Sequence, residues 1–252
     1  MRKKIIVGNW KMNKTKQEAK EFCLVFNSFT KEIKNKDILI GVAPSYLALE
    51  TLKKESKGLL LFAQNCHAKE SGAFTGEVSL PMLKEVGVDG SLVGHSERRK
   101  YQYESSVDCN EKLQALFKNN LTPIYCVGET LEEYETNKGK DVIEKQLKEG
   151  LEGIGGNDVS KMVIAYEPVW SIGTGKNASK EIAQDICNYI RKNIEDWYGK
   201  KVADQVLIQY GGSVKPENVK SYLSCPDIDG VLVGGSSLEA KQFEQLIKNI
   251  IE

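Results

Sequence analysis

The chain has 252 residues, a length that fits either two ordinary domains or one α/β barrel. Its 35 basic and 35 acidic residues cancel, which argues against nucleic acid or an anionic membrane as the main partner. No apolar run is long enough to span a bilayer, and the apolar residues 5–7 are too few for a signal-peptide core.

Short apolar runs alternate with longer amphipathic segments along the chain. Strands are expected at residues 4–7, 38–42, 59–63, 90–93, 122–127, 162–166, 206–209 and 230–233. The clearest helices are expected at residues 16–32, 141–153, 179–197 and 239–250, with Ser179 as an N-cap. Eight alternations at this length predict a single (β/α)8 TIM barrel with parallel strands over residues 1–252. A doubly wound sheet fits less well, because Gly8-Asn9-Trp10-Lys11 does not match the dinucleotide-binding glycine pattern.

Six cysteines are scattered through the expected helices and strands without a C-x-x-C pair. Without a secretion signal, they indicate reduced thiols and a cytoplasmic protein. Cys66 and His67 are the only adjacent pair of possible metal ligands, so no metal site is expected.

One octapeptide occurs twice in similar form. Residues 89–96 read DGSLVGHS and residues 229–236 read DGVLVGGS, on the expected fourth and eighth strands. The match has two alternative explanations, an ancient half-barrel duplication or shared packing demands.

A glutamate followed by a glycine-containing tip comes directly after the sixth strand, where residues 165–175 read AYEPVWSIGTG. Proline restricts its own backbone and that of Glu167, whereas glycines permit turns that other residues resist. In a barrel, strand carboxyl ends form the active-site face. The order therefore predicts a catalytic carboxylate, Glu167, beside a closing lid formed by Pro168, Val169, Trp170, Ser171, Ile172, Gly173, Thr174, Gly175 and Lys176.

Two glycine pairs follow the last two strands, in Gly211-Gly212-Ser213 and Gly234-Gly235-Ser236. Glycines let a backbone approach an anion, and a following helix would point free N–H groups at it. A phosphate site is therefore expected here, the alternative being two tight turns that simply need glycine.

The remaining polar residues at strand ends are few. His95 precedes an expected helix start, whose N–H groups could donate to one ring nitrogen and favour a neutral imidazole able to act as an acid. Lys11, beside Asn9, could be a Schiff-base nucleophile or a fixed positive charge. Glu97 could be only a first-turn helix residue, or it could pair with Lys11.

A long irregular stretch, residues 64–80, carries Phe74 among small residues. An exposed aromatic there suggests insertion into a partner. The alternative is an Ω-loop folded back on its own barrel.

Together these segments resemble the triosephosphate isomerase family. The resemblance rests on motifs in order along the whole chain: GNWKMN from residue 8, GAFTGE from 72, GHSERR from 94, AYEPVW from 165, IGTGK from 172, YGGSV from 210 and VGG from 233. It implies interconversion of dihydroxyacetone phosphate and glyceraldehyde 3-phosphate through an enediol(ate), in glycolysis and gluconeogenesis. The reaction relocates protons, so no cofactor or metal is implied.

The resemblance also implies the residue roles. Glu167 would be the base, His95 the neutral acid and electrophile, and Lys11 the electrostatic stabiliser, with Glu97 beside Lys11. Substrate contacts would come from Asn9, Lys11, Gly173, Ser213, Gly234 and Gly235.

A homodimer is implied as well, with an interface that includes Phe74, Thr75, Glu77, Arg98 and Glu104. Separately, the resemblance implies a structural ion pair between Arg191 and Asp227. Several residues depart from the common family pattern: Ser171 and Ser236 replace alanine, Tyr134 stands where arginine is usual, and Lys14 replaces glycine.

Two other functions remain open from the residues. One is a Schiff-base aldolase that uses Lys11, and the other is a phosphosugar-binding scaffold without turnover. The joint presence of Lys11, His95 and Glu167 argues against the scaffold.

Overall fold

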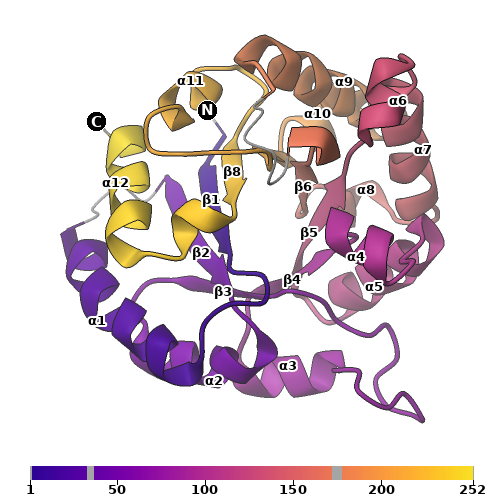
Figure 1. Cartoon of the computed structure of the whole chain (residues 1–252). Helices are drawn as coiled ribbons and strands as arrows, with labels where there is room; N and C mark the ends of the chain where they lie inside the picture. The colour runs from indigo at the N-terminus through magenta and orange to yellow at the C-terminus, as the bar shows by residue number, and fades with distance from the viewer. Residues whose placement is uncertain (1, 33–36, 172–177, 252) are drawn as a thin grey trace.

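The computed structural model describes residues 2–32, 37–171 and 178–251. Its eight strands form one closed barrel in which every neighbouring pair is parallel (Figure 1). The strands are β1 (Lys4–Asn9), β2 (Ile38–Ala43), β3 (Leu60–Ala63), β4 (Gly90–Val93), β5 (Thr122–Val127), β6 (Val163–Tyr166), β7 (Leu207–Tyr210) and β8 (Gly230–Val233). The predicted (β/α)8 barrel is confirmed.

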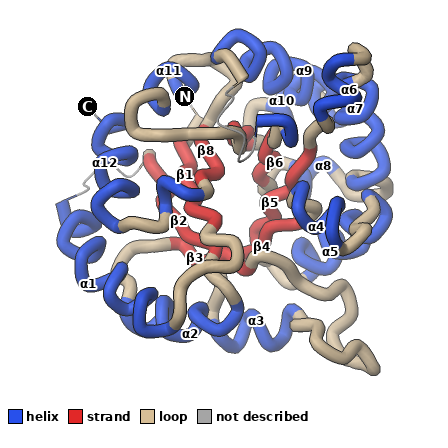
Figure 2. The backbone as a smooth tube through the Cα atoms, in the orientation of Figure 1, coloured by secondary structure: helices blue, strands red, loops and turns tan. Residues whose placement is uncertain are grey.

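Helices surround the strands on the outside, as Figure 2 shows. They are α1 (Lys16–Glu32), α2 (Tyr46–Glu55), α3 (Leu80–Val86), α4 (Ser96–Tyr101), α5 (Ser106–Lys118), α6 (Leu131–Glu135), α7 (Gly139–Gly150), α8 (Gly156–Val159), α9 (Lys180–Tyr198), α10 (Lys200–Ala203), α11 (Val219–Leu223) and α12 (Ala240–Ile251). Two short 3-10 turns are η1 (Val169–Ser171) and η2 (Gly235–Ser237). No described helix is long and apolar enough to cross a membrane.

Several predicted boundaries were wrong by one to three residues. β1 continues two residues past Val7, because Gly8 and Asn9 pair with Val42 and Ala43 of β2. β7 is shifted to end at Tyr210, which pairs with β6 and β8. The helix expected at residues 141–153 is α7, Gly139–Gly150. Local hydrophobicity does not report backbone pairing with a neighbouring strand, so these ends were misplaced. The predicted N-cap is confirmed, since Ser179 Oγ accepts the Ile182 N–H at 3.3 Å.

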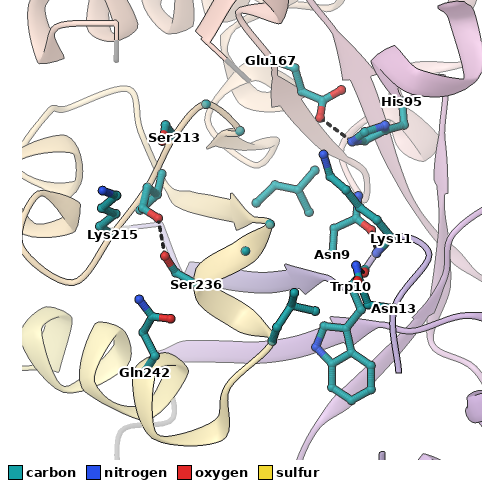
Figure 3. A pocket seen from close by; sticks show the side chains of 17 residues that line it. Asn9, Trp10, Lys11, Asn13, His95, Glu167, Ser213, Lys215, Ser236 and Gln242 are labelled. Carbon is teal, nitrogen blue, oxygen red and sulfur yellow. Dashed lines mark hydrogen bonds and ion pairs between the residues drawn. The ribbon is translucent and has the colours of Figure 1, made fainter. Parts of the chain in front are cut away.

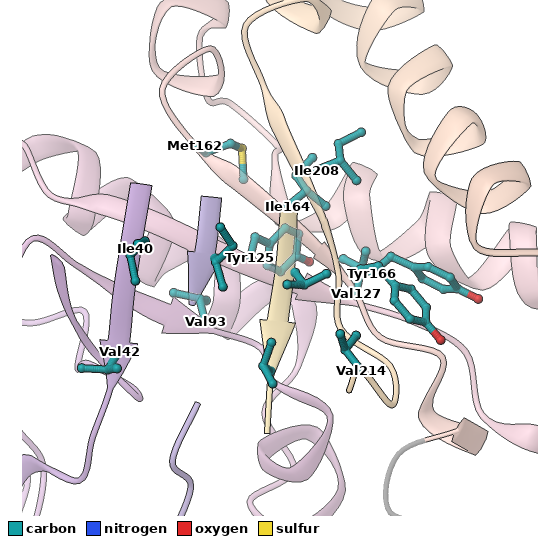
Figure 4. Close-up of a cluster of buried hydrophobic side chains, with 14 of the residues drawn as sticks. Ile40, Val42, Val93, Tyr125, Val127, Met162, Ile164, Tyr166, Ile208 and Val214 are labelled. Carbon is teal, nitrogen blue, oxygen red and sulfur yellow. The ribbon is translucent and has the colours of Figure 1, made fainter. Parts of the chain in front are cut away.

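The core has two layers because successive strand residues point to opposite faces of the sheet. On β6, Val163 and Ala165 pack inside the barrel, whereas Ile164 and Tyr166 pack between strands and helices. Figure 4 shows part of this outer layer, including Tyr125, Ile164 and Ile208. Burial on both faces explains why the strands are continuously apolar in sequence.

The repeated octapeptide has the same backbone role in both halves of the barrel. The Asp89 carboxylate accepts the Leu61 N–H at 2.8 Å, and the Asp229 carboxylate accepts the Ile208 N–H at 2.9 Å. A Cβ on Gly90 or Gly230 would overlap a carbonyl of the next strand. Equivalent packing demands therefore account for the shared aspartate and glycine.

The implied Arg191–Asp227 ion pair is confirmed and is part of a larger buried group. The Arg191 guanidinium contacts Asp227 at 2.8 Å and Asp229 at 2.6 Å, and it also donates to three backbone carbonyls, those of Ala203, Val206 and Asp227. This group joins α9 to the residues that precede β7 and β8.

Replacing Arg191 with methionine is expected to lower the free energy of unfolding by about 3–5 kcal/mol, since it leaves two buried carboxylates without that cation. Lys192→Met, at the adjacent exposed position of α9, is the control and should cost less than about 0.5 kcal/mol. Denaturant unfolding at one protein concentration measures both. Equal stability of the two variants would contradict this role for Arg191.

Candidate active site

A cavity of about 430 Å³ lies at the carboxyl ends of the barrel strands (Figure 3). Its lining comes from the segments that follow β1, β4, β6, β7 and β8. The lining residues are Asn9, Trp10, Lys11, Asn13, His95, Glu167, Gly211, Gly212, Ser213, Val214, Lys215, Leu232, Gly234, Gly235, Ser236, Leu238 and Gln242. Most of the site residues expected from sequence therefore share one cavity. Lys215 and Gln242 were not expected, because neither stands at a strand end.

Glu167 and His95 form the central contact of this cavity. Glu167 Oε1 lies 2.9 Å from His95 Nε2, and the second carboxylate oxygen accepts the Ser96 N–H at 3.1 Å. Both side chains are buried, Glu167 at 2% and His95 at 5% exposure. Because the Glu167 N–H binds the Val127 carbonyl at 2.8 Å, the barrel holds the backbone that carries this carboxylate.

The contact at Nδ1 fits a neutral His95 ring with its proton on Nε2, whereas the Glu167 carboxylate at Nε2 favours the imidazolium. Nδ1 accepts the Glu97 N–H at 3.2 Å, as the expected helix start suggested. Burial opposes the imidazolium, but contact with Glu167 outweighs it and raises the pKa of His95 above its ordinary value. Burial likewise opposes the carboxylate, yet His95 and the Ser96 N–H hold the pKa of Glu167 below its ordinary value. If Glu167 moved away, burial would become the dominant influence on the pKa of His95 and would lower it.

Lys11 is held over the cavity by both its backbone and its side chain. Its φ is 53°, in the left-handed region, and its N–H donates to Asn9 Oδ1 at 3.0 Å. Its Nζ lies 2.7 Å from Glu97 Oε1, which confirms the pairing that the sequence left open. Gln64 donates to the Lys11 carbonyl at 2.8 Å, so the loop after β3 helps to fix this residue.

Ser213 and Ser236 lie across the cavity from His95 (Figure 3), whereas Gly211 lies beside Glu167, because a Cβ on Gly211 would come within 3.0 Å of Glu167 Cγ. A Cβ on Gly235 would meet open space, and one on Gly234 only the Lys11 Cε at 3.7 Å. Neither glycine has a left-handed φ. Open space at these positions favours close approach of a ligand over the alternative of simple tight turns.

The expectation of a helix pointing at the phosphate from each glycine pair was wrong in part. After Ser213 the next helix begins only at Val219, and after Gly234 there is only the 3-10 turn η2. Donors at this end would therefore be individual loop N–H groups and side chains. A glycine pattern alone does not predict the backbone geometry of a tight loop.

The first part of the expected lid is anchored to Glu129, a residue that was not predicted from the sequence. Glu129 Oε1 accepts from Trp170 Nε1 at 2.8 Å and from the Tyr166 hydroxyl at 3.0 Å, and burial raises the pKa of Glu129. The Tyr134 ring stacks on Trp170 with centroids 4.6 Å apart. Glu129 lies just past β5, so its strand-end position was the signal that could have found it. Ile172, Gly173, Thr174, Gly175 and Lys176 lie outside the described residues.

The charged residues expected near an interface form a cluster within the chain. Glu104 contacts Arg98 Nε at 2.7 Å and Lys112 Nζ at 2.6 Å, and Lys112 also binds Asn65 Oδ1 at 2.8 Å. Lys112 was missed because it looks like an ordinary helix residue. Glu77 is exposed in the loop before α3.

The loop after β3 projects away from the barrel past α3 (Figure 1). Its Phe74 is 44% exposed, and the ring also packs on His67 of the same loop at 4.2 Å between centroids. Thr75 is exposed beside it. The loop thus packs partly on itself while still presenting an aromatic edge to solvent.

The fold and this cavity define a (β/α)8-barrel enzyme with a buried carboxylate–imidazole pair at the strand ends. The family model described as triosephosphate isomerase matches residues 4–250, and the chain belongs to this family. Curated relatives named triosephosphate isomerase are 50% identical over 248 residues in Streptococcus mutans serotype c and 47% identical over 249 residues in Streptococcus pneumoniae serotype 19F. A relative of that name from Streptococcus pyogenes serotype M2 is 47% identical over 247 residues. Each match covers 98% of both chains.

Proposed function

We propose that this chain interconverts dihydroxyacetone phosphate and glyceraldehyde 3-phosphate with Glu167 as base, His95 as neutral acid and Lys11 as electrostatic stabiliser. Family membership carries the reaction. The observation that supports the roles is the buried contact of Glu167 with His95, in a cavity that Lys11 also lines.

In the proposed reaction, Glu167 removes a proton from the carbon next to the carbonyl and forms an enediol(ate). Both of its carboxylate oxygens are engaged by His95 and Ser96 in the structure, so Glu167 leaves them to reach the substrate. The freed Nε2–H of His95 then faces the substrate oxygens and moves protons between them. Lys11 offsets the negative charge that develops on those oxygens.

The phosphate would bind at the opposite end of the cavity, at the N–H groups of Ser213, Gly234 and Gly235 with Gly173. Asn9 is 5% exposed, lines the cavity and orients Lys11, which supports its role in substrate contact. Residues 168–176 complete the proposal as a lid that excludes water from the enediolate. The anchoring of Trp170 to Glu129 supports a fixed starting point for this lid.

A coupled isomerase assay on the purified protein tests the proposal directly. Turnover in both directions supports the isomerase. Binding of a phosphosugar analogue without turnover would instead support the scaffold, and a covalent substrate adduct on Lys11 after borohydride treatment would support the aldolase. The contact of Lys11 Nζ with Glu97 Oε1 at 2.7 Å argues against the aldolase, because it already engages the atom that would have to attack the substrate carbonyl.

We further propose a homodimer that uses the loops after β1, β3 and β4. These loops and the end of α4 carry exposed apolar side chains, namely Met12 at 96%, Phe74 at 44%, Tyr101 at 62% and Tyr103 at 87% exposure. Such a concentration of exposed apolar area marks an interaction surface. Thr75, Glu77 and the Arg98–Glu104 pair border it.

Phe74→Glu is expected to raise the dimer dissociation constant by about 30-fold or more, the loss typical of a central aromatic. Leu24→Glu, at an exposed leucine of α1, is the control and should leave association unchanged. Sedimentation velocity across micromolar concentrations measures both. A fully active wild-type monomer at these concentrations would refute the homodimer.

The glycolytic reaction of the family further supports a cytoplasmic location as part of the proposal. All six cysteines are free and buried, which is compatible with a reducing compartment. Fractionation of cells that make the protein would test this location.

A further inference from the structure

The two loops at the phosphate end of the cavity have little backbone pairing between them. β7 and β8 pair only through Gln209 with Gly230 and Tyr210 with Val231, so the ladder stops before either glycine pair begins. Both loops then run as Gly-Gly segments, which have more backbone freedom than other residues. Something besides the strand ladder must set the distance between them.

Each loop is held mainly by its other neighbour. On the β7 side, the Gly211 N–H binds the Tyr166 carbonyl of β6 at 2.7 Å. On the β8 side, the Trp10 indole N–H binds the Ser237 carbonyl at 3.1 Å, so η2 is tied to the segment after β1. These contacts fix each loop separately, and Asn249 of α12 holds the later Pro216 carbonyl at 2.8 Å. The two glycine-containing segments themselves are joined by one further bond.

That bond is donated by Ser236. Its hydroxyl donates to the Val214 carbonyl at 3.0 Å, and the dashed line at Ser236 in Figure 3 marks it. In the described parts of the chain, no other hydrogen bond joins residues 211–214 to residues 234–237. The adjacent Ser237 hydroxyl is used differently, because it bonds the Val233 and Gly234 carbonyls of its own loop.

We propose that Ser236 is a positioning residue that presets the spacing between the Ser213 and Gly234–Gly235 segments for a phosphate group. Since its hydroxyl proton is committed to Val214, Ser236 acts through the loop backbones and not as a direct donor to the anion. A preset site saves the entropy of ordering two glycine loops when the anion binds. The proposal rests on the phosphate-binding role given above to these loops.

Ser236→Ala tests this by removing the bond while keeping the backbone. We expect KM for either triose phosphate, and the dissociation constant of inorganic phosphate, to rise together by about 2- to 12-fold, the ratio that one ordinary hydrogen bond supplies. We expect kcat to change less than about 2-fold, because the bond lies at the phosphate end, away from Glu167 and His95. Ser236→Thr keeps the hydroxyl and should restore both constants.

Ser224→Ala is the matched control. It removes a similar serine-to-carbonyl bond, from Ser224 to Ser221 at 2.7 Å on the exposed surface of α11, and should change neither constant. Hydrogen exchange of residues 211–218 without ligand supplies a second readout. It should be faster in Ser236→Ala than in wild type, as expected when loops lose a cross-link.

An unchanged KM and phosphate dissociation constant in Ser236→Ala would overturn the proposal. Weaker phosphate binding with unchanged ligand-free exchange would also overturn it, because Ser236 would then be a direct ligand. If wild-type protein binds phosphate in the expected Ser236-dependent way yet shows no turnover, the proposed function fails and the inference about Ser236 stands.

Discussion

Shortening Glu167 to aspartate is expected to lower kcat by about 10²- to 10³-fold while the fold stays intact. The substitution retracts the carboxylate by one methylene. Because the Glu167 N–H is bound to the Val127 carbonyl and Pro168 follows it, the backbone cannot advance to compensate. A misplacement of about 1 Å at the reacting atom suffices for a loss of this size.

The measurement is kcat at saturating substrate in both directions, with thermal unfolding as the check on folding. Glu111→Asp, at an exposed position of α5, is the matched control and should leave kcat unchanged. Turnover close to wild type in Glu167→Asp would remove Glu167 from the role of base. If the unfolding temperature of Glu167→Asp drops strongly, lost packing would explain the lower kcat. Glu167→Gln keeps the side-chain length but removes the carboxylate, so it separates the loss of the base from the loss of packing.

His95→Gln is expected to lower kcat by about 10²- to 10⁴-fold, the range that a positioned general acid supplies. Glutamine can still donate an N–H, so it keeps part of the contact with Glu167. It cannot exchange a proton with the substrate near neutral pH, so the shuttle between the two oxygens is lost.

His67→Gln serves as the control, because His67 is the only other histidine of the chain and does not line the cavity. Both variants are compared at one protein concentration, with their oligomeric state measured alongside. Comparable kcat values for His95→Gln and wild type would mean that another group transfers the proton. Lys11 would then be the next candidate, since it lies in the same cavity.

The strands were predictable because each is a local apolar run between turn signals, and β4, β5 and β8 were predicted to the residue. Glu167, His95 and Lys11 were predictable for a related reason. A barrel gathers all strand ends at one face, so polar residues at those ends converge whatever their spacing in the chain. The barrel topology explains why these residues share one cavity. The family motifs indicated which of the strand-end residues to expect there.

The contacts made by side chains far apart in sequence were not predictable in this way. Glu129 has no sequence feature that points to Trp170, and Lys112 has none that points to Glu104 and Asn65. From the sequence, Ser236 was noted only as a replacement of alanine. Only its distance to the Val214 carbonyl gives it a role.

By itself, then, the sequence determined the alternation of strands and helices, the strand ends that carry His95, Glu167 and Lys11, and the two glycine pairs. These features depend on residue type and local periodicity, so they can be predicted without knowing which side chains become neighbours in the fold. The tertiary structure alone decided how Glu167 meets His95 and Ser96, how Glu97 holds Lys11, and which bond spans the loops after β7 and β8. Those contacts depend on barrel closure and strand register, which bring side chains from different strands within hydrogen-bond distance and which no single segment encodes.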